Sequence, residues 1–364
     1  MAEALSRRPA PVPLELMYVG ARRGVERRVM KDHWIPSMFI IARPLPTRRS
    51  LATLTAMGAL ALGCCQAWWL LRRVRPAAVF GTGGYASACV VYAAAHLGIP
   101  TLIHDLDASP GRASRRLARL ATRVTVGYPE AAAALGRPDA IHTGNPIRGE
   151  IGSASRAEGL AAFGLAADRR TLLVLGGSQG ARRLNDAVLT GASALVCELA
   201  LQILHITGPA DWDRVRAGRE ALPPDVLAHY QVRPYLEGTM HLALAAADVC
   251  LCRSGAGTVG ELTAVGIPGI YVPYPFALGH QAKNAEAVAQ SGGGTIIQDG
   301  VLTGESLVAE IRALLEGDRL ASMAAAARAC GRPDAADHIA AVLLDMVGEG
   351  CEHGRSGGAG RPLG

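Results

Sequence analysis

The chain has 364 residues, enough for two ordinary domains, and half of them are apolar while only 4% are aromatic. Its eight cysteines form no Cys-x-x-Cys pair and no secretory signal is evident, so we expect reduced thiols in a cytosolic protein and exclude a disulfide-built scaffold. The net charge of +6 fits an anionic substrate or an anionic membrane surface. Nucleic acid is not expected as a partner, because the basic residues lack interleaved aromatic side chains.

Short apolar runs alternate with helix-length segments along the chain. The runs that read as strands are residues 14–19, 77–80, 99–104 and 124–127, then 172–175, 201–206, 231–232, 249–251, 270–272 and 294–297. Strands without polar alternation are typical of a parallel sheet covered on both faces. Two such series predict an α/β fold of two facing doubly wound, Rossmann-like domains, with the ligand in a cleft between the carboxyl ends of their strands.

The pattern restarts after Gly144, Asn145 and Pro146, which sets the domain boundary. We therefore expect an amino-terminal domain over residues 1–144 and a second domain over residues 145–334. Residues 349–364 are rich in Gly, Arg and Ser with nothing to bury, and they predict a disordered tail.

Residues 51–71 carry no charge and are long enough to cross a bilayer. Thr53, Thr55 and Gln66 interrupt the apolar stretch, so a buried or interfacial helix is the better expectation. Arginines at both ends, with Trp68 and Trp69 near the exit, suit a helix resting on a membrane surface. A core helix with solvated arginine ends is the alternative.

Two glycine-rich loops in the second half each follow an apolar run and open a helix. They are residues 176–181 (Gly-Gly-Ser-Gln-Gly-Ala) and residues 252–261 (Cys-Arg-Ser-Gly-Ala-Gly-Thr-Val-Gly-Glu). Such a turn brings bare backbone N–H groups and the positive end of a helix dipole to one point, which suits a phosphate or diphosphate. The spacing differs from the Gly-x-Gly-x-x-Gly dinucleotide fingerprint, so the pattern favours a nucleotide sugar.

These motifs, together with residues 81–87, 144–148 and 273–285, resemble in order and spacing the MurG family of UDP-N-acetylglucosamine transferases. The resemblance runs from about residue 1 to residue 345. It implies a GT-B fold, a helix at about residues 335–347 returning to the amino-terminal domain, and a peripheral protein on the cytoplasmic face of the cell membrane. The implied reaction is inverting transfer of N-acetylglucosamine from UDP-N-acetylglucosamine to the C4 hydroxyl of undecaprenyl-pyrophosphoryl-N-acetylmuramoyl-pentapeptide, from lipid I to lipid II in peptidoglycan synthesis.

The donor site is expected in the second domain. Ser178 should hydrogen-bond the diphosphate, Arg148 should add a fixed positive charge, and Glu261 should grip the two ribose hydroxyls at the opposite end of the nucleotide. Gln281 resembles the family's reader of sugar hydroxyls, and Asn284 shares its helix face. The expected donor-binding set is Asp107, Arg148, Ser178, Gln179, Gly180, Leu236 (by the uracil), Ala256, Gly257, Thr258, Val259, Gly260, Glu261, Gln281 and Asn284.

The acceptor loop is expected at residues 81–87, which resemble the family's second amino-terminal glycine loop. Gly83 and Gly84 would let the backbone approach the acceptor diphosphate, and Tyr85 and Ser87 would donate to it.

Two departures from the family pattern concern catalysis. The family's first strand and Gly-Gly-Thr-Gly-Gly-His loop are absent, from which we expect a natural start upstream and poor folding or activity of the chain as it stands. The family's His-Glu-Gln-Asn is here His104-Asp105-Leu106-Asp107, so His104 and Asp105 are the candidates for assisting deprotonation of the acceptor hydroxyl.

Residues 105–107 and 211–213 each spell Asp-x-Asp, by which another glycosyltransferase fold holds a divalent cation. With an arginine and two helix ends on the phosphates, we expect no metal and no other cofactor. Two alternatives stay open: a transferase with another lipid acceptor, such as a diacylglycerol, and a non-catalytic descendant that binds UDP-sugar or membrane.

Overall fold

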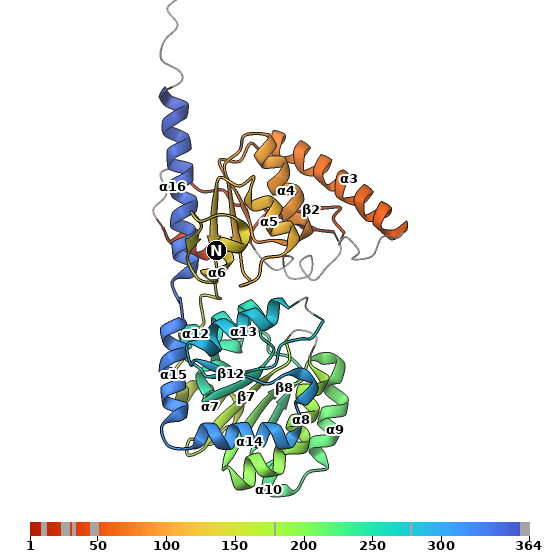
Figure 1. Cartoon of the computed structure of the whole chain (residues 1–364), viewed down its shortest axis with the longest axis vertical. Coiled ribbons are helices and arrows are strands. Elements are labelled where there is room, and N and C mark those ends of the chain that lie inside the picture. Colours follow the sequence, from red (N-terminus) through yellow and green to blue (C-terminus); the bar gives the residue numbers. More distant parts are fainter. Residues whose placement is uncertain are drawn as a thin grey trace, which may run out of the picture. The chain divides into compact units, whose positions relative to one another are not determined.

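The structure, a computed structural model, describes residues 1–8, 13–22, 30, 34–43, 51–177, 180–276 and 279–356 (Figure 1). The chain divides into two compact units, of which unit 1 is Met1–Thr143 with Asp334–Gly364 and unit 2 is Gly144–Pro333. The two boundaries expected from the sequence lie one residue further along the chain. How the units are placed relative to each other, and with it the expected cleft, stays a prediction.

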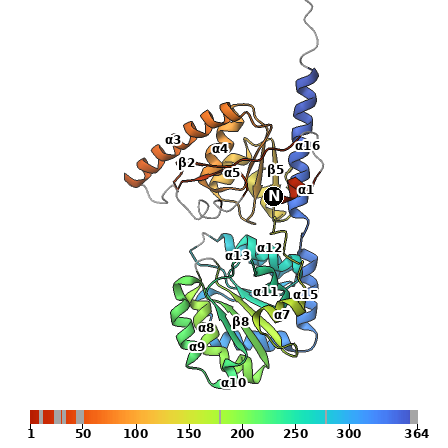
Figure 2. The same ribbon diagram turned by 180° about the vertical axis from the view of Figure 1, so that it is seen from behind.

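Unit 2 is built on a parallel sheet with helices on both faces (Figures 1 and 2). Its elements are α7 (Arg156–Phe163), β7 (Arg170–Leu175), α8 (Arg182–Ser193), η2 (Ala194–Glu198), β8 (Leu201–Ile206), η3 (Pro209–Asp211), α9 (Trp212–Glu220), α10 (Pro224–Leu227), β9 (Tyr230–Arg233), α11 (Met240–Ala246), β10 (Val249–Cys252), α12 (Ala256–Val265), β11 (Gly269–Tyr271), α13 (His280–Gln290), β12 (Gly294–Ile296), η4 (Asp299–Val301), α14 (Gly304–Leu315) and α15 (Arg319–Cys330). Among the described residues, the six strands run in the order β12-β11-β10-β7-β8-β9.

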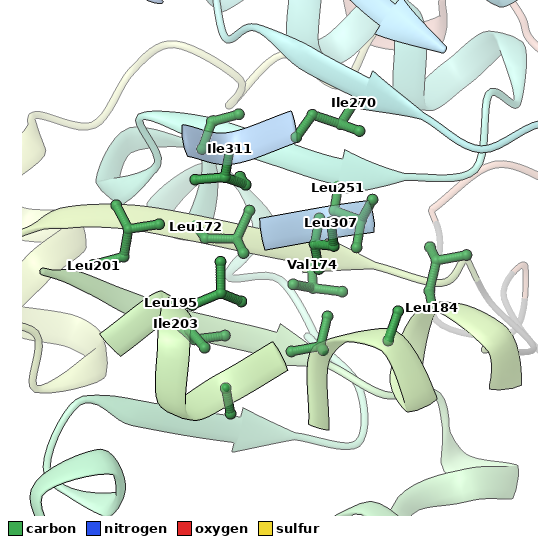
Figure 3. Packing of buried hydrophobic residues seen from close by; sticks show 14 of the residues in the cluster. Leu172, Val174, Leu184, Leu195, Leu201, Ile203, Leu251, Ile270, Leu307 and Ile311 are labelled. Atoms are coloured by element: carbon green, nitrogen blue, oxygen red, sulfur yellow. The ribbon is translucent and has the colours of Figure 1, made fainter. Parts of the chain in front are cut away.

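The strands of unit 2 are apolar throughout because both faces of the sheet are covered. Leu172 and Val174 of β7 pack toward α8 and α14 with the cluster drawn in Figure 3, whereas Leu173 between them points to the other face and is also fully buried. Leu184 of α8 and Leu307 of α14 close that cluster from the helix side. One core therefore holds β7 and α8 on either side of the loop that joins them.

Unit 1 has shorter strands. Its elements are α1 (Ala2–Arg7), β1 (Tyr18–Ala21), β2 (Ser37–Ile40), α3 (Leu51–Val74), β3 (Val79–Gly81), α4 (Gly84–His96), β4 (Thr101–Asp105), α5 (Arg112–Ala118), β5 (Arg123–Val126), α6 (Glu130–Leu135), β6 (Ile141–His142) and α16 (Ala335–Ser356). Within its described residues, β3-β4-β5-β6 form one parallel sheet and β1 and β2 form a separate parallel pair.

Three features of unit 1 differ from the sequence-based expectations. The strand expected at residues 14–19 is β1 at Tyr18–Ala21, because Leu14 and Leu16 instead pack against α1 and α16. The short strands β2 and β6 were not expected at all. Helix α16 runs to Ser356, past the expected end near residue 347, although this extension contains three glycines, which disfavour a helix. Of the tail expected at residues 349–364, residues 357–364 lie outside the described residues.

Candidate functional site

The two glycine-rich loops of unit 2 leave the sheet side by side. Strands β7 and β10 are neighbours, and their last residues, Leu175 and Cys252, are paired in register. The chain goes from β7 toward β8 on one side, whereas β10 is followed by β11 on the other, so the strand order reverses between β7 and β10. Ligands of open α/β sheets bind at the carboxyl ends of the strands at such a switch point. The convergence of the two loops predicted from the sequence is therefore present within unit 2.

The described glycines of the loop after β7 make close backbone contacts. Gly180 has a φ of +78°, and a Cβ there would lie 2.5 Å from the carbonyl oxygen of Thr207. A Cβ on Gly176 would lie 2.5 Å from the amide nitrogen of Ala181. The N–H of Gly180 donates to the carbonyl oxygen of Gly177 at 3.0 Å. This N–H group, which was expected to bind the nucleotide sugar, is therefore already hydrogen-bonded inside the loop. Ser178 and Gln179 lie outside the described residues, and their roles stay predictions.

A buried polar network supports the first turns of α8. The side-chain nitrogen of Asn185 donates to a carboxylate oxygen of Asp211 at 2.6 Å, and its side-chain oxygen accepts from the Nε2 of His205 at 2.8 Å. The other ring nitrogen of His205 contacts the Tyr230 hydroxyl at 2.8 Å, and Arg214 makes a two-pronged contact with Asp211. Burial lowers the pKa of His205 to about 3, which keeps the ring neutral. Hydrogen bonding by Arg214 lowers the pKa of Asp211.

The sequence-based reading missed this network except for Asn185, which it quoted as part of the motif. The available signal was a histidine inside an apolar run, since a buried imidazole needs partners for both ring nitrogens. Asn185 also donates to the carbonyl oxygen of Thr207, the atom against which Gly180 packs. The network therefore links the loop after β7 to the loop after β8.

The loop after β10 is held by the start of α13. Ser254 is fully buried and donates to the carbonyl oxygen of Gln281 at 2.8 Å, while Asn284 donates to the carbonyl oxygen of Ser254 at 3.3 Å. The side-chain oxygen of Gln281 accepts from the backbone N–H of Tyr274 at 2.9 Å. Asn284 is itself fully buried and holds this turn, and its expected place in the donor site stays a prediction.

Helix α12 carries the other expected donor residues on its first two turns. Ala256 and Val259 are buried, Thr258 and Gly260 are half-buried, and Gly257 is exposed at the first turn. Leu236 is buried in the segment that follows β9, at the same carboxyl edge of the sheet.

Arg148 and Glu261 are paired with each other. The Nε of Arg148 lies 3.0 Å from one carboxylate oxygen of Glu261 and its Nη2 lies 3.1 Å from the other. Burial raises the pKa of Glu261, and the charge of Arg148 opposes that rise. The two side chains therefore mark a single point in the structure described. That they fasten opposite ends of a nucleotide stays a prediction.

The expected acceptor loop of unit 1 joins β3 to α4. Gly83 and Gly84 have φ values of +88° and +80°, and a Cβ on either would meet nothing within 4 Å. The hydroxyl of Ser87 is buried, and among the described residues it has no hydrogen-bond partner. Tyr85 is exposed beside it. Two positive-φ glycines, an unsatisfied hydroxyl and a helix N-terminus leave room and donors for an anion at this point.

His104 and Asp105 are the last two residues of β4, next to β3 in the sheet. His104 is fully buried and its Nδ1 lies 3.0 Å from the hydroxyl of Thr125. A carboxylate oxygen of Asp105 accepts from the backbone N–H of Asp107 at 3.1 Å. The position inside the sheet favours a structural role for His104, whereas Asp105 lies at the carboxyl edge.

No cluster of three or more His, Cys, Asp or Glu side chains suited to a metal ion occurs in the part of the chain that the structure describes. Of the two Asp-x-Asp sequences, the second has Asp211 bonded to Arg214 and Asn185.

A separate surface lies on α3 of unit 1. One side of this helix packs on α4 through Ala67 and Leu71, while Leu54 and Trp69 are 67% and 62% exposed. Arg73 lies over the Trp69 ring at 5.5 Å from its centre. By length and composition, Leu54–Val74 is the one candidate membrane span among the described residues, and core helices of soluble proteins pass the same test.

The fold and the site define a class of protein, the GT-B glycosyltransferases, whose members have two such α/β units. Residues 1–126 match the glycosyltransferase family 28 N-terminal domain, and residues 171–339 match the glycosyltransferase family 28 C-terminal domain. The chain belongs to glycosyltransferase family 28. The predicted fold class and the family resemblance are thus confirmed.

Curated relatives carry the name UDP-N-acetylglucosamine–N-acetylmuramyl-(pentapeptide) pyrophosphoryl-undecaprenol N-acetylglucosamine transferase. The one from Halothermothrix orenii is 37% identical over 92% of this chain and 91% of its own length, and that from Desulforudis audaxviator is 39% identical over 96% and 94%. The crystal structure of MurG from Acinetobacter baumannii is similar with a TM-score of 0.72 and 26% identity, covering 95% of each chain. A UDP-GlcNAc 2-epimerase from Neisseria meningitidis shares the fold at a TM-score of 0.64 and 15% identity, covering 94% of each chain.

Proposed function

We propose that the chain transfers N-acetylglucosamine from UDP-N-acetylglucosamine to the C4 hydroxyl of N-acetylmuramoyl-pentapeptide on undecaprenyl pyrophosphate, in peptidoglycan synthesis. The anomeric carbon is inverted and UDP leaves. The observation that carries the proposal is the pair of adjacent loops at the switch point of unit 2, with Glu261 on the helix that follows the second loop. The names of relatives that match nine-tenths of the chain support the choice of substrates.

The donor side supplies electrostatic stabilisation. The leaving UDP gains negative charge in the transition state, so N–H groups and helix dipoles that already point at it lower the barrier. Helices α8 and α12 begin directly after the two adjacent loops. Ser178 and Gln179 complete this cradle in our proposal, and Glu261 holds the ribose hydroxyls.

The acceptor side supplies an anion site and a base. Gly83, Gly84, Tyr85 and the unsatisfied Ser87 hydroxyl would receive the acceptor diphosphate. Asp105 is the better placed of the two candidate bases, because it ends β4 whereas the ring of His104 is bonded to Thr125 inside the sheet. No step of this scheme needs a metal ion.

In our proposal the protein is peripheral on the cytoplasmic face of the cell membrane, and the exposed side of α3 is the part that contacts the bilayer. Exposed apolar side chains such as Leu54 and Trp69 enter the interface, and Arg72 and Arg73 near the helix end reach anionic headgroups.

Transfer of labelled N-acetylglucosamine tests the reaction. The chain is incubated with labelled UDP-N-acetylglucosamine and either a lipid I analogue or a diacylglycerol, and the lipid fraction and released UDP are measured. We expect label on the lipid I analogue with stoichiometric UDP. Label on the diacylglycerol alone would show that the proposed acceptor is wrong. UDP binding without any transfer would favour the non-catalytic alternative.

Vesicle sedimentation tests the membrane surface. We expect binding to phosphatidylglycerol vesicles but not to phosphatidylcholine vesicles, and a loss of about tenfold for Trp69→Ala, as partial burial of one aromatic side chain implies. Phe276→Ala is the control, because Phe276 is also an exposed aromatic residue but belongs to unit 2. Equal losses for the two variants would contradict the assignment to α3.

A further inference from the structure

Glu261 lies where the helix by itself does not favour a carboxylate. It is beyond the first turn of α12, where the dipole effect on a negative charge has faded, and its side chain is only 17% exposed. The nearby Glu150 carboxylate raises its pKa further. An ionised Glu261 therefore depends on a fixed positive charge, and Arg148 supplies it.

The position of Arg148 is set by packing along α12. Gly260 leaves room for the segment before Arg148, since a Cβ there would lie 3.3 Å from the Cβ of Asn145. The side-chain nitrogen of Asn145 lies 3.5 Å from the carbonyl oxygen of Ala256. The backbone carbonyl of Arg148 accepts from the N–H of Ile151, which closes the turn after it. The guanidinium therefore reaches Glu261 from a braced backbone.

The contact with Arg148 uses only half of the acceptor positions of the Glu261 carboxylate. A carboxylate offers about four acceptor positions on its two oxygens, and the Arg148 fork takes one on each. One acceptor position per oxygen remains, which matches the two neighbouring hydroxyls of a ribose. The pair thus forms a ready-made diol receptor rather than two separate clamps.

We propose that Arg148 is a positioning residue: its guanidinium orients Glu261 and keeps it ionised to bind the ribose diol, and it is not a ligand of the diphosphate. This inference rests on the proposed function, in which Glu261 binds the ribose of UDP. It predicts that the effect of Arg148 is felt through the ribose hydroxyls and is absent when they are removed.

Calorimetry with UDP and 2′,3′-dideoxy-UDP separates the two roles, because both ligands carry the same diphosphate. For the unaltered chain we expect UDP to bind about 100-fold more tightly than 2′,3′-dideoxy-UDP, because only UDP forms hydrogen bonds with the charged carboxylate. In Arg148→Gln the affinity for UDP should fall about tenfold or more, while that for 2′,3′-dideoxy-UDP stays within about twofold. An equal loss for both ligands would make Arg148 a diphosphate ligand and overturn the proposal.

Two further variants sharpen the result. Arg148→Lys keeps the charge but loses the fork, so we expect it to remain impaired for UDP alone, whereas a diphosphate contact would be largely restored by a lysine. Arg156→Gln is the matched control, because Arg156 forms a comparable ion pair with Asp248 in the same unit. It should change neither affinity.

The outcomes also distinguish the inference from the proposed function. If the unaltered, folded chain binds neither UDP nor its dideoxy analogue, the proposed function fails. If it binds both equally well, the diol receptor is wrong while a UDP site remains.

Discussion

The loop after β7 in unit 2 and the loop after β3 in unit 1 have the same design but are held differently. Each joins a parallel strand to a helix through glycines with positive φ. Gly180 in the first has the Thr207 carbonyl where a side chain would be, whereas Gly83 and Gly84 in the second have open space. Contacts within the protein therefore hold the described ends of the unit 2 loop, while the unit 1 loop has open space at its glycines and, among the described residues, a buried Ser87 hydroxyl without a hydrogen-bond partner. A loop already held in shape loses less entropy on binding.

Gly180→Ala should have the largest effect. The αL conformation costs a non-glycine residue about 1–2 kcal/mol, and the added Cβ must also displace the Thr207 carbonyl. We therefore expect the variant to need about 3 kcal/mol to keep the loop in its present conformation. UDP affinity measured by calorimetry should fall about 100-fold. An unchanged affinity would show that the loop is not held by this contact.

His205→Asn should change how stability depends on pH. The pKa of His205 is about 3 in the folded chain and about 6.5 when unfolded, so the unfolded state binds more protons between these values. Stability is therefore fully present above pH 6.5 and lost as the pH falls toward 3, by about 2 kcal/mol at pH 5.

Urea unfolding at pH 7, 6 and 5 measures this slope. The Asn variant should have a lower free energy of unfolding at pH 7. It should lose less of that free energy on acidification, because one proton fewer is taken up on unfolding. His338→Asn, at an exposed position on α16, should keep the slope of the unaltered chain. If all three proteins lose the same stability on acidification, burial of a neutral His205 does not cause the pH dependence.

Gly84→Ala should have a smaller effect, confined to the acceptor. Only the αL strain of about 1–2 kcal/mol applies, because no atom lies within 4 Å of the new Cβ. We expect the KM for the lipid acceptor to rise about tenfold while the KM for UDP-N-acetylglucosamine stays unchanged. Gly58→Ala in α3, which is equally open but lacks a positive φ, should leave both values as they are. A rise in the donor KM would contradict the division between the loops.

Ser87→Ala should have the smallest effect. Its hydroxyl has no protein partner among the described residues, so its removal should not lower the free energy of unfolding. We expect the acceptor KM to rise about fivefold, for the loss of one hydrogen bond. Thr295→Val removes another buried, unsatisfied hydroxyl, in β12 of unit 2, and should leave the acceptor KM unchanged.

The strands of unit 2 were predictable because burial on both faces makes them continuous apolar runs. The run at residues 201–206 matches β8 at both ends. In unit 1, β2 is four residues long and only half-buried, and its short apolar stretch Met-Phe-Ile is too brief to stand out as a strand. Leu14 and Leu16 look like part of a strand, but their apolarity serves packing against α16. Composition reveals burial, and it does not reveal which neighbour provides it.

The site was predictable as a set of loops but not as a set of contacts. Glycine spacing located both loops of unit 2, since glycine is required where backbone atoms meet. The pairing of Arg148 with Glu261 joins residues 113 positions apart, and either side chain alone looks like a ligand contact. Similarly, the burial of Asn284 and His104 depends on packing that no local pattern records.

Unit 1 draws its core from both ends of the chain. Leu5 of α1 packs with Leu344 of α16, and Leu102 of β4 packs with Ile339 of the same helix. During synthesis on the ribosome, all of unit 2 is made before α16 emerges, so unit 2 can fold while the first-made unit still waits for its last helix. This reverses the usual amino-terminal-first order of domain folding. The newly made unit 1 therefore keeps the apolar surface that α16 covers exposed until the end of synthesis.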